Sequence, residues 1–131
     1  MIRIVVDANI ILSALLGGSS RFILFDPQFE FVTTQFTLEE VERYLPHIAE
    51  KSGVSIEELR EALLLLPLII FSKEHYDSAL SQARKALRHI DPHDVDILAL
   101  YYTEETYLWS EDRDFERIIP PIRLLKTKDF F

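Results

Sequence analysis

Residues 2–9 read IRIVVDAN, a mostly apolar, β-branched run that stops at an aspartate. Because the run is continuous rather than alternating, residues 2–6 are predicted to form a strand buried on both faces. The next apolar run, residues 10–16, predicts a helix with Asn9 as its N-cap. Asp7 therefore lies between two buried segments. An unpaired buried carboxylate costs several kcal/mol, so Asp7 is expected to have a hydrogen-bond partner, a helix to cap or a metal ion to bind.

The rest of the chain alternates short apolar strands with amphipathic helices. Strands are predicted at residues 30–33, 68–71, 107–109 and 122–125. Helices are predicted over residues 21–25, 74–87 and 112–118, and from Ser55 to Pro67. Two more are predicted from their first residues. One begins at Thr37 as N-cap, with Glu40 in a capping box, and the other begins at Asp91. Pro46 is expected to kink or restart the helix that Thr37 caps. This order predicts one α/β domain over residues 1–131, a three-layer α/β/α sandwich with a central, mostly parallel sheet.

Composition excludes several classes of protein. The chain has 131 residues and no cysteine, so disulfides and thiolate metal sites are excluded. A net charge of −8 argues against nucleic-acid binding through a broad basic face. The longest apolar run, ALLLLPLIIF at residues 62–71, is about half of a membrane span and contains a proline. Since no cationic leader precedes an apolar stretch, the protein is expected to be cytoplasmic.

Acidic residues gather where the predicted strands end. Asp7 follows the first strand, Asp112 and Asp114 follow the strand at residues 107–109, and Asp94 lies in the first turn of a helix. Carboxyl ends of parallel strands share one edge of a sheet, where ligands bind. Each acid could instead cap a helix or face solvent. Together, however, close carboxylates repel one another by about 4 kcal/mol per pair at an effective dielectric near 20. Mg²⁺ or Mn²⁺, which prefer oxygen ligands, would remove this repulsion.

Four ordered motifs across residues 2–127 resemble the PIN domain: VVDANI, EEVERYL, DPHDVDILALYY and WSEDRDF. PIN domains are Mg²⁺- or Mn²⁺-dependent nucleases that act mostly on RNA, and many are toxins of toxin–antitoxin pairs. The resemblance implies the catalytic set Asp7, Glu40, Asp94 and Asp112, the metal ligands Asp7, Asp94 and Asp112, and the supporting residues Asn9, Ser110 and Asp114. Ser110 is expected to orient a carboxylate.

Some assignments stay open within this resemblance. Glu40 is chosen as the helix acid on the resemblance alone, because Glu39 is adjacent and a helical wheel puts Glu42 nearest the buried face. Two positions depart from the family pattern: Asp96 stands where proline is common, and Glu111 where a small residue is common. Both add negative charge without removing a motif acid.

The resemblance implies an RNA substrate and an antitoxin protein as partners, and the apolar run at residues 62–71 favours a second copy of the chain. Phosphate contacts could come from basic residues near the C-terminus or in residues 84–88, namely Arg113, Arg117, Arg123, Lys126, Lys128, Arg84, Lys85 and Arg88. The histidines His47, His75, His89 and His93 show no metal-ligand spacing, and His93 is the one nearest the acids. The alternative function is a catalytically silent, PIN-like binding or assembly module, with part of residues 62–71 as an oligomer interface.

Overall fold

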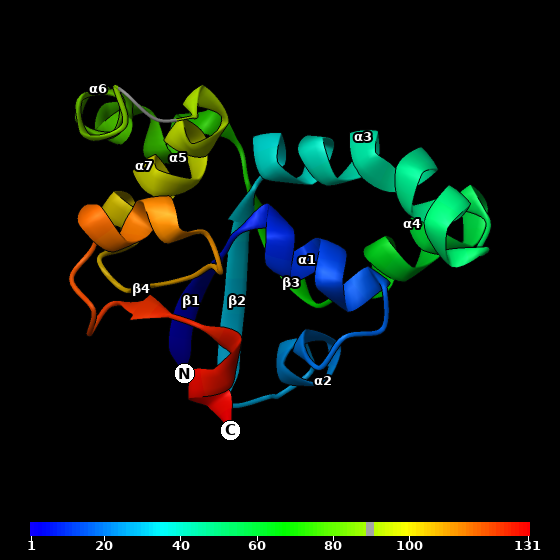
Figure 1. The fold of residues 1–131 in the computed structure, drawn as a ribbon. Coiled ribbons are helices and arrows are strands. Elements are labelled where there is room, and N and C mark those ends of the chain that lie inside the picture. Colours follow the sequence, from blue (N-terminus) through cyan, green and yellow to red (C-terminus); the bar gives the residue numbers. More distant parts are fainter. Residues whose placement is uncertain (89–90) are drawn as a thin grey trace.

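The computed structural model describes residues 1–88 and 91–131, so His89 lies outside the described residues. It contains a five-stranded, all-parallel sheet in the order β3-β2-β1-β4-β5 (Figure 1). The strands are β1 (Ile2–Val6), β2 (Phe29–Thr34), β3 (Leu68–Phe71), β4 (Tyr107–Trp109) and β5 (Leu124–Leu125). The predicted α/β class is confirmed, and the predicted last strand over residues 122–125 shortens to two residues.

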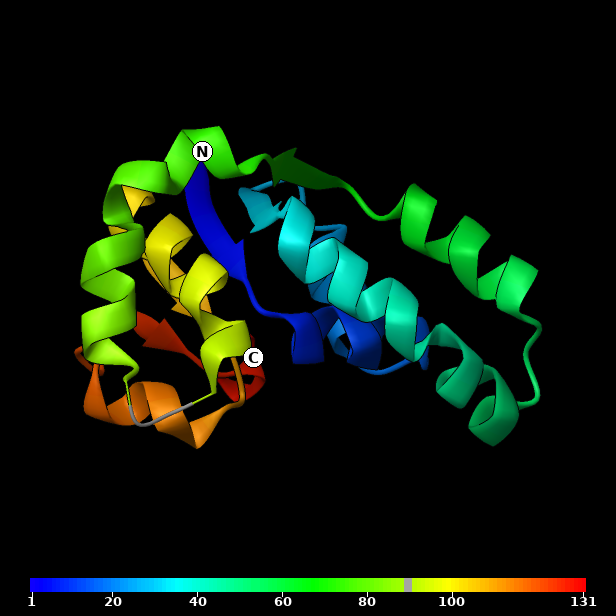
Figure 2. The same ribbon diagram turned by 90° about the horizontal axis from the view of Figure 1, so that it is seen from above.

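Helices cover both faces of the sheet. One face carries α1 (Ala8–Leu15), α2 (Ser20–Leu24), α3 (Gln35–Ser52) and α4 (Ile56–Leu65). The other carries α5 (Lys73–Tyr76), α6 (Leu80–Ala86) and α7 (Val95–Glu104), and Figure 2 shows β1 between these two groups. Ile4 and Val6 pack in the first layer, whereas Val5 packs in the second. Burial on both faces is therefore the reason why β1 has no polar alternation.

The starts of two helices differ from prediction. Asp7, not Asn9, caps α1, because Asp7 is still extended at the end of β1 and its Oδ1 accepts a hydrogen bond from the Ala8 N–H (2.8 Å). The predicted Thr37 cap is also wrong. Thr34 caps α3, and its Oγ1 accepts from the Thr37 N–H (2.8 Å). Both helices begin directly after their strands, so the strand end rather than the best-placed cap sets the start of each helix.

Other predictions for the helices hold in part. The restart predicted at Pro46 is wrong, since α3 runs through this residue without a break. Ser55 caps α4 as predicted and accepts from the Glu58 N–H (3.2 Å). The helix predicted over residues 74–87 is instead divided into α5, a 3₁₀ turn η1 (Asp77–Ala79) and α6. At the division Tyr76 is buried, and its hydroxyl donates to Asp96 on α7 (2.5 Å).

Asp91 and Pro92 begin a helix as predicted, although its first turn is the 3₁₀ turn η2 (Pro92–Asp94). Two further 3₁₀ turns are η3 (Arg113–Arg117), capped by Asp112, and η4 (Thr127–Phe130). In the described part of the chain, every helix is too short or too polar to cross a lipid bilayer.

Candidate metal centre

The site lies where β1 and β4 end. Val6 pairs with Trp109 in the sheet, and the Asp7 N–H donates to the Trp109 carbonyl (3.1 Å). This register places Asp7 beside Ser110, the first residue after β4. The sheet thus joins two segments that are about a hundred residues apart in the sequence.

A buried hydroxyl links two of the predicted acids. Ser110 Oγ donates to Asp7 Oδ2 (2.6 Å) and accepts from the Asp112 N–H (3.0 Å). The other oxygen of Asp7 is engaged by the Ala8 N–H. Asp7 is only 6% exposed, so these contacts replace the water that the carboxylate loses. The Asp7 side chain is thereby held in one orientation beneath the site.

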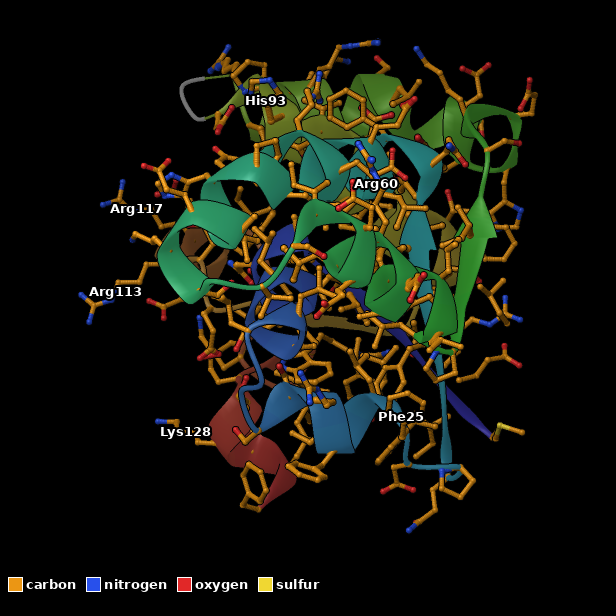
Figure 3. The ribbon with its side chains drawn as sticks, turned by 90° about the vertical axis from the view of Figure 1, so that its right-hand side faces the viewer. Phe25, Arg60, His93, Arg113, Arg117 and Lys128 are labelled. Carbon is orange, nitrogen blue, oxygen red and sulfur yellow. The ribbon has the colours of Figure 1, made fainter. Side chains whose placement is uncertain are left out.

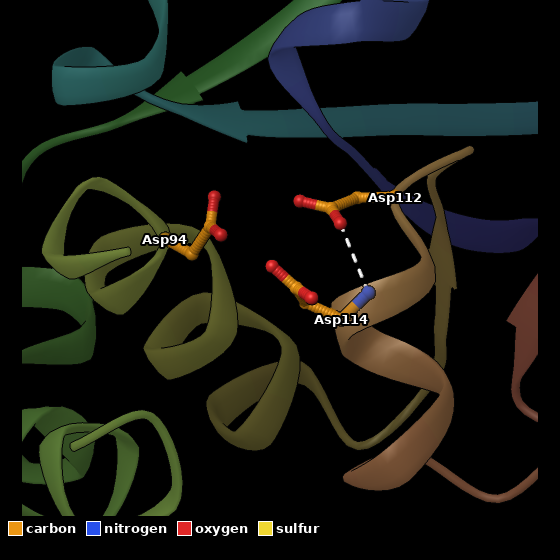
Figure 4. Close-up of side chains that lie close together, drawn as sticks. All are labelled: Asp94, Asp112 and Asp114. Carbon is orange, nitrogen blue, oxygen red and sulfur yellow. Dashed lines mark hydrogen bonds between the residues drawn. The ribbon is translucent and has the colours of Figure 1, made fainter. Parts of the chain in front are cut away.

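The side chains that converge are Asp94, Asp112 and Asp114 (Figure 4). Each offers a carboxylate oxygen, and these oxygens lie within 4.8 Å of one another. Asp112 Oδ1 also accepts from the Asp114 N–H (2.9 Å), which fixes the turn that presents both residues. Asp94 reaches the cluster from η2 on the opposite side. Asp7, a predicted ligand, is outside this convergent group, whereas Asp114, predicted only as a supporting residue, is within it.

The electrostatics of the cluster favour a cation. Burial, reinforced by the charges of Asp7 and Asp112, raises the pKa of Asp94 to about 8. Burial also raises the pKa of Asp7, against the lowering effect of the hydrogen bonds from Ser110 and Ala8. The carboxylates therefore repel one another, and carboxylate oxygens are the ligands that Mg²⁺ and Mn²⁺ prefer. The donor set fits either ion.

Asn9 lies two residues beyond Asp7, in the first turn of α1. Its Oδ1 atom is buried and accepts no hydrogen bond from the described residues. A buried acceptor of this kind normally has a partner, so the atom is available to a bound water or cation. Asn9 thus fails as the predicted helix cap, and its predicted role as a supporting residue of the site stays a prediction.

Of the three candidate acids on α3, Glu40 is the half-buried one, and Glu39 and Glu42 are exposed. Burial raises the pKa of Glu40, an effect that His93 and Arg43 oppose and that Asp7 increases. The charges of Asp7 and His93 act on Glu40 because it lies on the side of α3 that faces the site. The wheel prediction for Glu42 is wrong, because Leu38, which it treated as buried, is only half-buried.

The two additional acids have structural partners. Asp96 accepts from the Tyr76 hydroxyl (2.5 Å), and Glu111 Oε2 accepts from the Thr127 N–H (3.1 Å). Asp96 therefore holds α5 against α7, and Glu111 fastens the chain after β4 to η4. Neither belongs to the convergent group of carboxylates found among the described residues.

Two of the basic residues predicted near the C-terminus are engaged by contacts within the chain. Arg123 donates to the carbonyls of Glu105 and Thr106, and Lys126 pairs with Glu116 (3.6 Å). In Figure 3 the side chains of Arg113, Arg117 and Lys128 extend outward along one side of the molecule. These three of the C-terminal residues remain suited to contact phosphates, and Arg84, Lys85 and Arg88 are exposed as well.

Three side chains near the acids are not among the residues singled out from the sequence, although two of them lie within the motif EEVERYL. Phe36 and Tyr44 lie four residues before and after Glu40, and Arg43 is adjacent to Tyr44. Residues at a spacing of four share one face of a helix. A search for polar and aromatic residues at this spacing around Glu40 would have found this stripe on α3.

Comparisons with known proteins give one family match and several solved structures with a similar fold. The sequence profile of the PIN domain matches residues 5–119. Among solved structures, VapBC2 from Rickettsia felis bound to a promoter DNA fragment matches with a TM-score of 0.74 and 17% identity, over 95% of this chain and 98% of that chain. DNA-bound VapBC from Salmonella typhimurium matches with a TM-score of 0.68 and 22% identity, over 96% and 98%. VapBC-1 from nontypeable Haemophilus influenzae matches with a TM-score of 0.64 and 17% identity, over 96% and 97%. No curated protein sequence gives a significant match.

Proposed function

Because this chain belongs to the PIN domain family, we propose that it is a Mg²⁺- or Mn²⁺-dependent endoribonuclease that hydrolyses phosphodiester bonds of RNA in the cytoplasm. The PIN fold is typical of metal-dependent nucleases. The observation that supports the proposal is the convergence of Asp94, Asp112 and Asp114 at the carboxyl ends of the strands. The proposed catalytic residues are Asp7, Glu40, Asp94 and Asp112.

The acids have three different roles in the proposed mechanism. Asp94 and Asp112 belong both to the predicted ligand set and to the convergent group, so they would hold the ion. Asp7 and Asp114 complete the negative surface on either side, and Ser110 keeps Asp7 in position. When bound, Mg²⁺ or Mn²⁺ lowers the pKa of a coordinated water and stabilises negative charge on the reacting phosphate. Glu40, half-buried beside the cluster, would orient the attacking water.

The proposal predicts RNA cleavage that requires a divalent cation. A set of single-stranded and structured RNAs is incubated with the purified protein in Mg²⁺, in Mn²⁺ and in EDTA. Cutting is expected with either cation and is expected to stop in EDTA, because unscreened carboxylates would repel the phosphate. Metal binding is measured in parallel by calorimetry. Absence of both cleavage and metal binding would contradict the proposal and favour a silent binding module.

We also propose that the chain is the toxin of a toxin–antitoxin pair and forms a homodimer. A toxin–antitoxin complex from Klebsiella pneumoniae and the VapBC structures share this fold, which supports an antitoxin partner. A protein-contact surface is supported by the end of α4, where Leu64 is 84% exposed and Leu65 is 73% exposed. Adjacent exposed leucines at a helix end are costly in water unless another chain covers them. This exposure supports the proposal that part of residues 62–71 forms an oligomer interface.

Replacing Leu64 with Glu is expected to convert the dimer to a monomer. The charge would have to be buried at the interface, which costs several kcal/mol without a partner. Light scattering of the purified protein measures the change in mass. Glu61→Gln, on the same helix, is the matched control. A wild type that is monomeric at micromolar concentration would contradict the homodimer but not the nuclease.

A further inference from the structure

A pocket of about 340 Å³ lies beside the metal centre, between α3 and the η2 turn. It is lined by Glu40, Arg43, Tyr44, Asp91 and His93. Its volume is at the lower end of the range for small-molecule sites. Because Glu40 is a proposed catalytic residue, whatever fills this pocket lies next to the bond that is cut.

The pocket has aromatic walls. The His93 ring is stacked against Phe36, with 6.1 Å between the ring centroids and 20° between the ring planes. Its orientation is fixed further by Asp91 Oδ1, which lies 2.9 Å from His93 Nδ1 and also accepts from the His93 N–H. The His93 side chain is nevertheless 58% exposed, and Tyr44 is 55% exposed. Two rings are thus presented to solvent, one of them already held in place.

The charges of the pocket indicate which part of a nucleotide it can hold. Glu40 and Asp91 would repel a phosphate, but their oxygens can accept hydrogen bonds from the N–H groups of a base. Arg43, also on the lining, is suited to a backbone phosphate. A second hollow, of about 460 Å³, shares Arg43 with this pocket and is lined also by Phe36, Glu39, Glu42 and Arg60, which is labelled in Figure 3. An aromatic platform next to cationic side chains is the usual design of single-strand binding sites.

We propose that this pocket binds one unpaired nucleobase next to the scissile phosphate, stacked on His93 and Tyr44, with Arg43 contacting the backbone. The inference rests on the proposed nuclease function and assigns the place where one unpaired base of its RNA substrate would bind. A base within a duplex is already paired and stacked, so it cannot enter the pocket.

The test uses a single-stranded RNA in which each nucleotide in turn is made abasic. In the wild type, one abasic position flanking the cut is expected to reduce the cleavage rate by about 5- to 140-fold, the range for loss of one stacked base. In Tyr44→Ala and His93→Ala the intact RNA is cleaved more slowly, and the ratio of intact to abasic rates falls toward 1. His93→Phe keeps a stacking ring and is expected to retain a ratio near that of the wild type.

Two matched controls lie away from the pocket. Phe22→Ala removes an exposed aromatic ring from α2, and Lys51→Ala removes a cation from the other end of α3. Both are expected to match the wild type at every abasic position. Circular dichroism and thermal melting establish that the variants are folded.

A second readout separates this inference from the nuclease proposal. Affinity for the same RNAs, measured by fluorescence anisotropy in EDTA, does not require cleavage and should show the same abasic position. Hydrolysis of bis(p-nitrophenyl) phosphate with Mn²⁺ tests the metal centre without any base. If that ester is hydrolysed but neither cleavage nor affinity depends on a base, the pocket assignment is wrong and the nuclease stands. If nothing is hydrolysed but affinity falls at one abasic position in the wild type alone, the nuclease is wrong and the pocket stands.

Discussion

Replacing Asp94 with Asn is expected to lower metal-dependent RNA cleavage at least about a hundredfold while making the metal-free protein more stable. Loss of one group that stabilises charge in a transition state costs about 10²–10³ in rate. Asp94 is the member of the convergent group that comes from η2, so without its charge the ion would be held from the side of η3 alone. The measurement is the initial rate of cleavage, with the variant and the wild type purified identically.

The gain in stability follows from the raised pKa of Asp94, about 8 in the folded protein against 3.8 in its ordinary state. At a pH between these two pKa values, Asp94 keeps its proton in the folded protein but releases it in the unfolded chain. The wild type therefore loses free energy of unfolding as the pH rises from about 4 to about 8. Asn has no such proton, so the variant should match the wild type near pH 4. Near pH 8 it should exceed the wild type by about 1–3 kcal/mol, a range reduced because the side chain is partly solvated.

Urea denaturation in EDTA across this pH range measures the difference. Added Mg²⁺ should then stabilise the wild type but not the variant, since binding to the folded state alone contributes about 2.7 kcal/mol at a hundred times the dissociation constant. Asp26→Asn, far from the acids in the loop after α2, is the matched control for loss of a carboxylate. Equal cleavage by Asp94→Asn and the wild type would indicate a contaminating nuclease and would remove the basis for the proposed centre.

Much of the scaffold is predictable from local patterns. The unalternating run that becomes β1 indicates burial on both faces, and strands that alternate with helices indicate a parallel sheet. These two inferences suffice to place Asp7 at the carboxyl edge of the sheet. The structure then brings Asp7 beside Ser110 through the pairing of Val6 with Trp109, a contact that depends on strand order. Strand order is a tertiary property that no local pattern contains.

The wrong predictions concern places where the sequence favours two local structures almost equally. Thr34 and Thr37 are both good N-caps, and the choice falls to Thr34 because β2 ends there and their hydroxyls contact each other (2.7 Å). From the sequence, Asp114 is predicted only as a supporting residue and not as a metal ligand. It joins the cluster because the η3 turn that Asp112 caps directs it toward Asp94, which is distant in the chain. Contacts of this kind are set by the packing of η3 and η2 rather than by the spacing of the acids.

A hydrogen bond of Tyr76 stabilises the part of the chain that carries Asp94. The Tyr76 hydroxyl donates to Asp96, and the burial of this tyrosine interrupts the helix predicted over residues 74–87. This hydrogen bond joins α5 to the first turn of α7, which begins directly after Asp94. The departure from the family pattern at Asp96 is consequently explained by a contact that stabilises the turn carrying a proposed metal ligand.

Replacing Trp109 with Ala is expected to reduce the free energy of unfolding by about 3–5 kcal/mol, the usual cost of removing a buried tryptophan side chain. Trp109 is fully buried. Its ring centroid lies 5.6 Å from that of Phe31 and 4.6 Å from that of Phe130. Its Nε1–H also donates to Thr127 Oγ1 (3.1 Å). The side chain therefore joins the centre of the sheet to the C-terminal η4 turn, directly before Ser110.

Such a loss is a large part of the 5–15 kcal/mol that stabilises a typical domain, so the variant should unfold at a much lower urea concentration. Trp109→Phe keeps an aromatic ring and should lose less, whereas Ile122→Ala, at an exposed position, should change stability by no more than about 0.5 kcal/mol. Because Ser110 positions Asp7 and Asp112 follows it, the cavity left by Trp109→Ala should also lower the affinity for Mn²⁺ in molecules that remain folded. A loss of stability below about 1 kcal/mol would mean that Trp109 does not anchor the strand end that carries these acids.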